Sequence, residues 1–318
     1  MDMKPRKVMI IGAGNVGSSA AYALLNQQIC EEIILVDLNS QLAQGHRQDL
    51  ADAAAYMPSR ITIATRPSSD CADVDIAVIT VSGGALKPGQ TRLDELDATA
   101  RIVNHIVPEM MQNGFNGIFL IATNPCDIIT YQVWKLSGLP RNQVLGTGVW
   151  LDTTRLRRIL AEQLDIAAQS VDAFILGEHG DTQFPVWSHS TVYGMTLKEY
   201  SRLKTGQELD FVALGDRIRQ LGFEIYSQKG CTEYGVAGTI TEICRNLFTS
   251  SYRALTVSCV LDGEYGQQGL AIGVPAVLSQ NGIAQIIELD LNELEQRQFN
   301  ESAASIKLNI QRLAVVHH

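Results

Sequence analysis

The chain has 318 residues, of which 46% are hydrophobic, and a formal net charge of -9. This length and apolar content exclude intrinsic disorder and suit two domains, or one large α/β domain with an appendage. The acidic balance without a basic block argues against a nucleic-acid partner. No stretch approaches the roughly 18 consecutive apolar residues of a membrane span, so we expect no membrane partner. The six scattered cysteines are typical of reduced thiols in a cytoplasmic protein.

The first predicted element is a buried strand at 8–11, which leads directly into a glycine-rich turn and a helix. The turn reads GAGNVG at 12–17, and a second strand at 33–36 ends at Asp37. In this context the pattern is the dinucleotide-binding fingerprint, whose glycines permit a tight turn, the approach of a pyrophosphate and close helix packing. Asp37 is placed to accept hydrogen bonds from ribose hydroxyls and to repel a 2′-phosphate, which favours NAD over NADP.

Two further buried strands, at 76–80 and 117–121, alternate with helices at 41–56 and 93–112. Alternation of strands and helices predicts a Rossmann-type, doubly wound parallel sheet, so the fold class is α/β. Ligands of such sheets lie at the carboxyl ends of the strands.

Those carboxyl ends carry polar and glycine-rich segments. A loop at 81–92, rich in glycine, has the composition of a mobile lid and ends at Arg92, which is either a solvated helix-start residue or a group that moves over a substrate carbonyl. After the strand at 117–121 comes Asn124, which can both donate to and accept from a ligand, and whose bond to Pro125 is a candidate for the cis form. The candidate cofactor-binding residues are Gly12, Gly14, Asn15, Val16, Gly17, Asp37, Gly83 and Asn124.

The second half begins with a helix that carries Asp152 and Arg155 on one face. An exposed ion pair is the simpler interpretation, but apolar neighbours favour a buried carboxylate that orients a histidine and a guanidinium that binds a carboxylate. That histidine is His179, which lies between two glycines in the run LGEHGDT at 176–182. We interpret His179 as the proton donor and acceptor of a hydride-transfer enzyme.

The remaining chain is predicted to be α+β. We expect helices at 210–228 and 233–248, strands at 257–261, 269–278 and 282–289, and a closing amphipathic helix over 291–313. The predicted division is a cofactor domain at 1–147 and a substrate domain at 148–318.

Five motifs together resemble one family in order and spacing, over nearly the whole chain. They are GAGNVG at 12–17, KPGQTR at 87–92, TNP at 123–125, LDTTR at 151–155 and GEHGD at 177–181. The chain resembles the L-lactate/malate dehydrogenases, on the lactate side. The resemblance implies NAD as the cofactor, a 2-oxo or 2-hydroxy acid as the substrate, no metal site, and a homo-oligomer that is a dimer or a homotetramer.

The resemblance also implies roles for individual residues. His179 would protonate the substrate carbonyl as hydride arrives, and Asp152 would hold the ring tautomer and raise the imidazole pKa. Arg155 would bind the substrate carboxylate.

Three more residues receive roles in the same way. Arg92 would polarise the C2 carbonyl, Asn124 would hydrogen-bond near the carbonyl and the nicotinamide, and Thr232 would line the substrate pocket.

The chain departs from the family pattern at two pocket positions. Leu86 stands where malate enzymes carry an arginine and typical lactate enzymes a glutamine, and Leu221-Gly222 stands where two alanines are usual. A leucine cannot pair with a second carboxylate, which argues against oxaloacetate. Leu86 and Gly222 predict a roomier apolar pocket, so an L-2-hydroxyisocaproate dehydrogenase acting on bulky apolar 2-oxo acids is the alternative to an ordinary lactate enzyme.

Two rival interpretations belong to other functional classes. A metal-dependent NAD glycosidase shares the cofactor fold, but no Cys/His ligand pair is apparent near Asn124. A non-catalytic NAD-binding protein is the second rival, against which the set of His179, Asp152, Arg155 and Arg92 argues.

Overall fold

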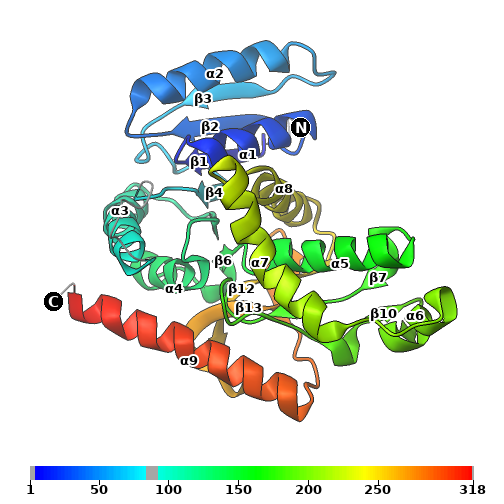
Figure 1. Cartoon of the computed structure of the whole chain (residues 1–318). Coiled ribbons are helices and arrows are strands. Elements are labelled where there is room, and N and C mark those ends of the chain that lie inside the picture. Colours follow the sequence, from blue (N-terminus) through cyan, green and yellow to red (C-terminus); the bar gives the residue numbers. More distant parts are fainter. Residues whose placement is uncertain (1–3, 84–91, 317–318) are drawn as a thin grey trace.

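Six short strands from the first half of the chain form the parallel part of one large sheet (Figure 1). The computed structural model describes residues 4–83 and 92–316. The parallel strands are β1 (Lys7–Ile11), β2 (Glu32–Val36), β3 (Thr62–Thr65), β4 (Ile76–Ile79), β5 (Ile118–Ile121) and β6 (Val144–Gly146). Their order is β3-β2-β1-β4-β5-β6, which confirms the doubly wound sheet. The apolar runs of β4 and β5 are buried along their whole length because helices cover both faces.

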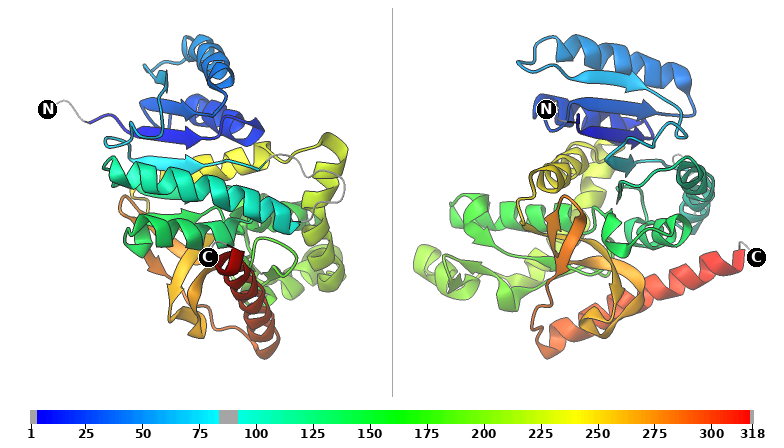
Figure 2. Two further views of the ribbon diagram at one scale, coloured as in Figure 1. Left: turned by 90° about the vertical axis from the view of Figure 1, so that its left-hand side faces the viewer. Right: turned by 180° about the vertical axis from the view of Figure 1, so that it is seen from behind.

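The helices between these strands cover the two faces of the sheet. They are α1 (Asn15–Asn26), α2 (Ser40–Ala54), α3 (Arg92–Gln112) and α4 (Cys126–Ser137). Helices α3 and α4 pack together on one face, and α1 packs beside α8 (Tyr234–Thr249) on the other (Figure 2). Helix α8, from the second half of the chain, thus helps to cover a face of the sheet that the first half forms.

Three antiparallel strands extend the same sheet beyond β6. They are β12 (Ala254–Asp262), β13 (Gln268–Ser279) and β14 (Gly282–Ile286). Strand β12 pairs with β6 through Ser258 opposite Gly146, so the sheet of nine strands runs without interruption from the first half of the chain into the second. The pairing places Ser258 of β12 beside the carboxyl end of β6.

A second hydrophobic core lies under α5 (Trp150–Leu164), and includes Leu156, Leu160 and Ile218. The other helices of this half are α6 (Leu197–Thr205), α7 (Phe211–Lys229) and α9 (Glu293–Val316), and short 3-10 turns span Arg141–Gln143, Ala168–Ser170, Trp187–His189 and Glu264–Gly266. The small strands are β7 (Val171–Asp172), β8 (Ile175–Leu176), β9 (Phe184–Pro185), β10 (Thr191–Val192) and β11 (Met195–Thr196). Helix α9 crosses below the antiparallel strands, and α7 runs diagonally across the centre of the view (Figure 1).

Within the described residues, no helix combines the length and apolar character that crossing a bilayer would require. All six cysteines lie in the described ranges and are free of disulfides, and five of them are buried.

Candidate active site

The turn at 12–17 is shaped by close contacts between main-chain atoms. Gly12 has a φ of +104°, and a methyl group on Gly17 would lie 1.9 Å from the Gly12 carbonyl oxygen. These contacts explain why both positions require glycine. A methyl group on Gly14, in contrast, would meet nothing within 4 Å, so the space in front of this residue is open.

The open space in front of Gly14 fits a pyrophosphate. Gly14 is the N-cap of α1 and provides no side-chain hydrogen bond to the first turn, which includes Asn15 and Val16. Exposed main-chain N–H groups at a helix N-terminus bind anions. The donor set therefore suits the phosphates of a dinucleotide.

Asp37 lies at the end of β2 and is joined to the glycine-rich turn. Its carboxylate accepts hydrogen bonds from Ala13 N–H at 2.7 Å and from Asn39 N–H at 2.8 Å. A carboxylate has about four lone-pair positions, so acceptor capacity remains for ribose hydroxyls. The position supports the predicted preference for NAD.

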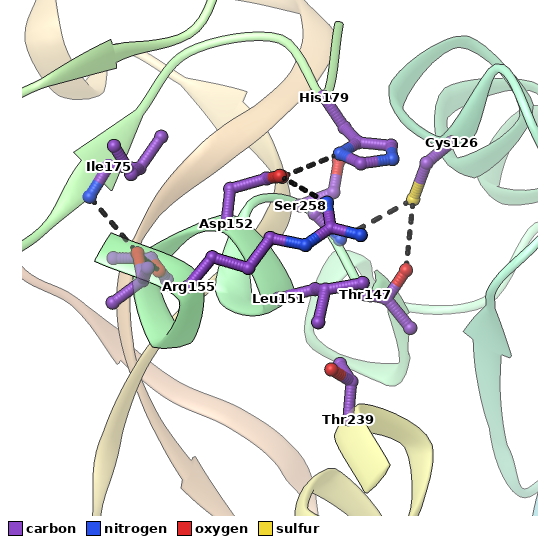
Figure 3. A network of polar contacts seen from close by, with 12 residues as sticks. Cys126, Thr147, Leu151, Asp152, Arg155, Ile175, His179, Thr239 and Ser258 are labelled. Atoms are coloured by element: carbon purple, nitrogen blue, oxygen red, sulfur yellow. Dashed lines mark hydrogen bonds and ion pairs between the residues drawn. The ribbon is translucent and has the colours of Figure 1, made fainter. Parts of the chain in front are cut away.

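The structure brings His179, Asp152 and Arg155 together at one point (Figure 3). Asp152, in the first turn of α5, places one carboxylate oxygen 2.7 Å from His179 Nδ1 and accepts from Arg155 Nη1 at 3.0 Å with the other. The Asp152 side chain is only 2% exposed, whereas that of His179 is 28% exposed. The ring therefore has a buried anchor at Nδ1, while part of the side chain remains accessible.

The electrostatic environment favours a charged imidazole beside a charged carboxylate. Burial of the ring alone would lower the pKa of His179, but the charge and hydrogen bond of Asp152, together with the charge of Asp127, outweigh it and raise the pKa above its ordinary 6.5. Burial of Asp152 likewise opposes ionisation, but His179 and Arg155 hold its pKa below the usual value. The arrangement suits an acid–base group that works near neutral pH.

The main chain of the His179 loop is fixed by polar side chains on α4 and α9, and a side chain on β12 supports the first of these. Asp127, in the first turn of α4, accepts a hydrogen bond from His179 N–H at 2.7 Å. Ser258 on β12 donates to the other oxygen of Asp127 at 2.5 Å. Ser302 on α9 accepts from Glu178 N–H at 2.7 Å. None of the three residues was predicted from the sequence, although a carboxylate in the first turn of a largely apolar helix was a signal for Asp127.

Two predicted pocket residues lie on α7 and on the segment that follows it, one beside this centre and one near the cofactor turn. A methyl group on Gly222 in α7 would lie 3.5 Å from Arg155 Nη1, so Gly222 faces the guanidinium. Thr232 follows Cys231, whose thiol interacts with the Asn15 side chain at the start of α1. The segment that holds Thr232 is therefore adjacent to the cofactor turn.

For the remaining predicted residues, the described part of the structure contains no hydrogen bond or ion pair with His179, Asp152 or Arg155. Asn124 is exposed at the end of β5, and its bond to Pro125 is cis, as predicted. Gly83 lies against α3, where a methyl group would come within 2.4 Å of Ala98 Cβ. Leu86 lies outside the described residues, and only the main chain of Arg92 is described, as the first residue of α3.

Within 4–83 and 92–316, no group of three or more His, Cys, Asp or Glu side chains is arranged to hold a metal ion.

The chain is similar to known proteins over nearly its whole length. Residues 6–146 match the model of the lactate/malate dehydrogenase NAD-binding domain, and residues 150–315 match the model of the lactate/malate dehydrogenase α/β C-terminal domain. L-lactate dehydrogenase 2 of Listeria innocua is 72% identical over 311 residues, which cover 98% of this chain and 100% of that protein. L-lactate dehydrogenase 3 of Bacillus cereus is 46% identical, over 95% and 96% of the two chains.

Solved structures agree with these matches. The ligand-bound minor L-lactate dehydrogenase of Enterococcus mundtii has a TM-score of 0.93 at 38% identity, with 98% of this chain and 99% of that chain covered. A lactate dehydrogenase from a Medee basin deep-sea metagenome library has a TM-score of 0.95 at 36% identity, with coverage of 98% and 100%. The two family models together match residues 6–146 and 150–315, and a relative 72% identical is an L-lactate dehydrogenase, so the chain belongs to the lactate/malate dehydrogenase family.

Proposed function

We propose that the chain catalyses reversible hydride transfer between NADH and a small 2-oxo monocarboxylic acid, as an L-lactate-type 2-hydroxy acid dehydrogenase. The observation that carries this proposal is the convergence of His179, Asp152 and Arg155, with Asp152 in contact with both of the other side chains. The cofactor supplies the hydride, and the protein supplies binding, orientation and a proton.

Each of the three side chains has a distinct role in this proposal. His179 donates a proton from Nε2 to the substrate carbonyl oxygen during reduction and recovers it during oxidation, because Nδ1 is held by Asp152. Asp152 keeps the ring oriented and stabilises the imidazolium. Arg155 binds the substrate carboxylate, since a guanidinium presents two parallel donors to it.

Other predicted residues complete the site. Arg92 polarises the C2 carbonyl, and Asn124 and Thr232 line the space between substrate and nicotinamide. Gly12, Gly14, Asn15, Val16, Gly17, Asp37 and Gly83 form the NAD side. The open position at Gly14 supports this assignment.

A second candidate activity, on bulky apolar 2-oxo acids, is favoured by the position of Gly222. Because its missing side chain faces Arg155, the glycine leaves space beside the substrate carboxylate. Leu86, which the sequence places in the same pocket, supplies an apolar surface and no partner for a second carboxylate. Each additional buried methylene stabilises binding by about 0.8 kcal/mol.

A substrate panel tests both candidates. NADH oxidation is measured with pyruvate, 2-oxoisocaproate and oxaloacetate, and kcat/KM is compared for the wild type and Gly222→Ala. We expect turnover of the monocarboxylic acids and little turnover of oxaloacetate. A larger kcat/KM for 2-oxoisocaproate than for pyruvate, with a ratio that falls in Gly222→Ala, would establish the bulky-substrate activity. A strong pyruvate preference that the variant leaves unchanged would exclude it.

The same panel tests the main proposal. If the purified protein binds NADH but reduces none of the 2-oxo acids, the non-catalytic NAD-binding alternative replaces it.

We further propose that the chain is a cytoplasmic homo-oligomer whose cofactor and substrate domains meet near residue 147. Five buried, unpaired cysteines support the compartment. Large exposed apolar side chains on α1, α7 and α8, which include Tyr22, Phe223 and Tyr234, support the assembly. Analytical ultracentrifugation distinguishes monomer, dimer and tetramer.

A further inference from the structure

The carboxylate of Asp127 lies behind the His179 loop and has no role in the proposed reaction. Its two oxygens accept hydrogen bonds from His179 N–H at 2.7 Å and from Ser258 Oγ at 2.5 Å. The residue is only 2% exposed, so solvent does not screen its charge effectively. Asp127 therefore connects α4, β12 and the main chain of His179 through one buried group.

Burial makes the ionised form of the Asp127 carboxylate less favourable. Burial raises the pKa of Asp127 to about 6, although the bonds from Ser258 and His179 oppose the increase. The carboxylate is therefore mostly ionised at neutral pH. A neutral asparagine could form the same two contacts without desolvating a charge, so a purely structural role does not require an aspartate.

The negative charge of Asp127 acts on the imidazole of His179. The negative charge of Asp127 raises the pKa of His179, in addition to the larger effect of Asp152. Glu178 also acts on Asp127 and opposes its ionisation. The neighbouring Cys126 thiol stays neutral near pH 7 because burial raises its pKa to about 12.

Three other groups complete these surroundings. Burial also raises the pKa of the Cys259 thiol on β12. On the α5 side, Arg155 opposes protonation of His179, while Asp152 favours it. Asp127 and Asp152 therefore form a pair of buried carboxylates that act on one imidazole.

We propose that Asp127 is a positioning residue that holds the main chain of His179 against β12 and provides a second negative charge favouring the protonated imidazole. Asp152 orients the ring, and Asp127 orients the segment that carries it. This inference rests on the proposed function, since the protonated imidazole is the form that reduces the substrate carbonyl.

The variant Asp127→Asn separates the two parts of the proposal. Its amide oxygen accepts from His179 N–H, and its amide NH2 donates to Ser258 Oγ after the hydroxyl rotates, so the position is kept and the charge is lost. Asp127→Ala removes both contacts and the charge. Glu295→Gln is the matched control, because Glu295 is a buried carboxylate, 3% exposed, that accepts from Ser188 N–H at 3.0 Å on a different segment.

Two measurements are compared across these variants. The first is the pH at which kcat/KM for 2-oxo acid reduction falls on the basic side. The second is the titration of the His179 ring by NMR in the NAD-free protein, assigned by the resonance that is missing in His179→Asn. In Asp127→Asn we expect both to move down by about 0.5–1 pH unit, with kcat at low pH close to that of the wild type. In Asp127→Ala we expect the same shift together with a fall in kcat of about tenfold, since the loop loses its anchor.

A control variant and a replacement variant accompany these measurements. Glu295→Gln should leave both pH values unchanged. If Asp127→Asn does not fold, Ser258→Ala is measured instead. Loss of the Ser258 donor raises the pKa of Asp127, so a smaller shift in the same direction is expected.

The inference is overturned if folded Asp127→Asn titrates like the wild type, or if Asp127→Ala and Asp127→Asn have the same kcat. The NMR titration tests the inference even if the wild type reduces no 2-oxo acid. That outcome would contradict the proposed function but not the inference about Asp127.

Discussion

The turn at 12–17 and the segment at 177–182 both contain glycines and both contribute to the candidate site, but different contacts hold them in place. In the turn, main-chain atoms touch each other, and a methyl group on Gly17 would overlap the Gly12 carbonyl. In the segment, side chains from α4 and α5 hold the main chain and the ring of His179. Substitutions at Gly12 and Gly17 therefore add atoms where there is no space, whereas substitutions around the segment remove partners from buried polar groups.

The largest effect is expected where the segment loses its charged partner. Asp152→Asn removes the negative charge beside His179 Nδ1 and favours the wrong ring tautomer. We expect kcat to fall by about 10²–10⁴-fold, with the fold and NADH affinity retained. Steady-state kinetics and NADH fluorescence titration measure the two quantities. A variant with nearly normal kcat would show that Asp152 does not support catalysis.

A smaller and different effect is expected in the turn. Gly17→Ala should lower the free energy of unfolding of the NAD-free protein by about 1–3 kcal/mol, because neither the helix nor the strand can move away without cost. Gly14→Ala is the matched control, since nothing lies within 4 Å of its added methyl group. We expect Gly14→Ala to unfold like the wild type but to bind NADH about tenfold more weakly.

Thermal unfolding and NADH titration of the two variants separate packing from cofactor contact. Equal loss of stability in both variants would contradict the contrast drawn between the two glycines.

The sequence predicted the parts of the fold with strong periodicity. The buried runs that became β1, β4 and β5 could be predicted because strands covered on both faces are continuously apolar. Strand β6 has only three residues, and β3 has four of which only Ile63 is buried, so neither has a clear pattern. Helix α4 was missed as well.

The site also has residues that could be predicted from the sequence and residues that could not. His179, Asp152 and Arg155 were predicted because their motifs are distinctive, and the structure confirms that they are in contact. The sequence carried a signal for Asp127 in the first turn of α4, but not its partners, because the contacts between α4, β12 and the His179 loop are created only by the tertiary structure. Leu86 lies outside the described residues, so its place in the pocket stays a prediction.

The pH dependence of the two reaction directions tests the role of His179 most directly. Reduction requires the protonated ring and oxidation the neutral ring, and Asp152 raises the pKa of His179 above 6.5 despite the burial of the ring. With saturating cofactor, kcat/KM for reduction should therefore fall, and kcat/KM for oxidation should rise, as the pH increases through one common pKa above 6.5. Two unrelated pKa values, or a reduction rate that does not fall between neutral and alkaline pH, would contradict the assignment of His179 as the acid–base group.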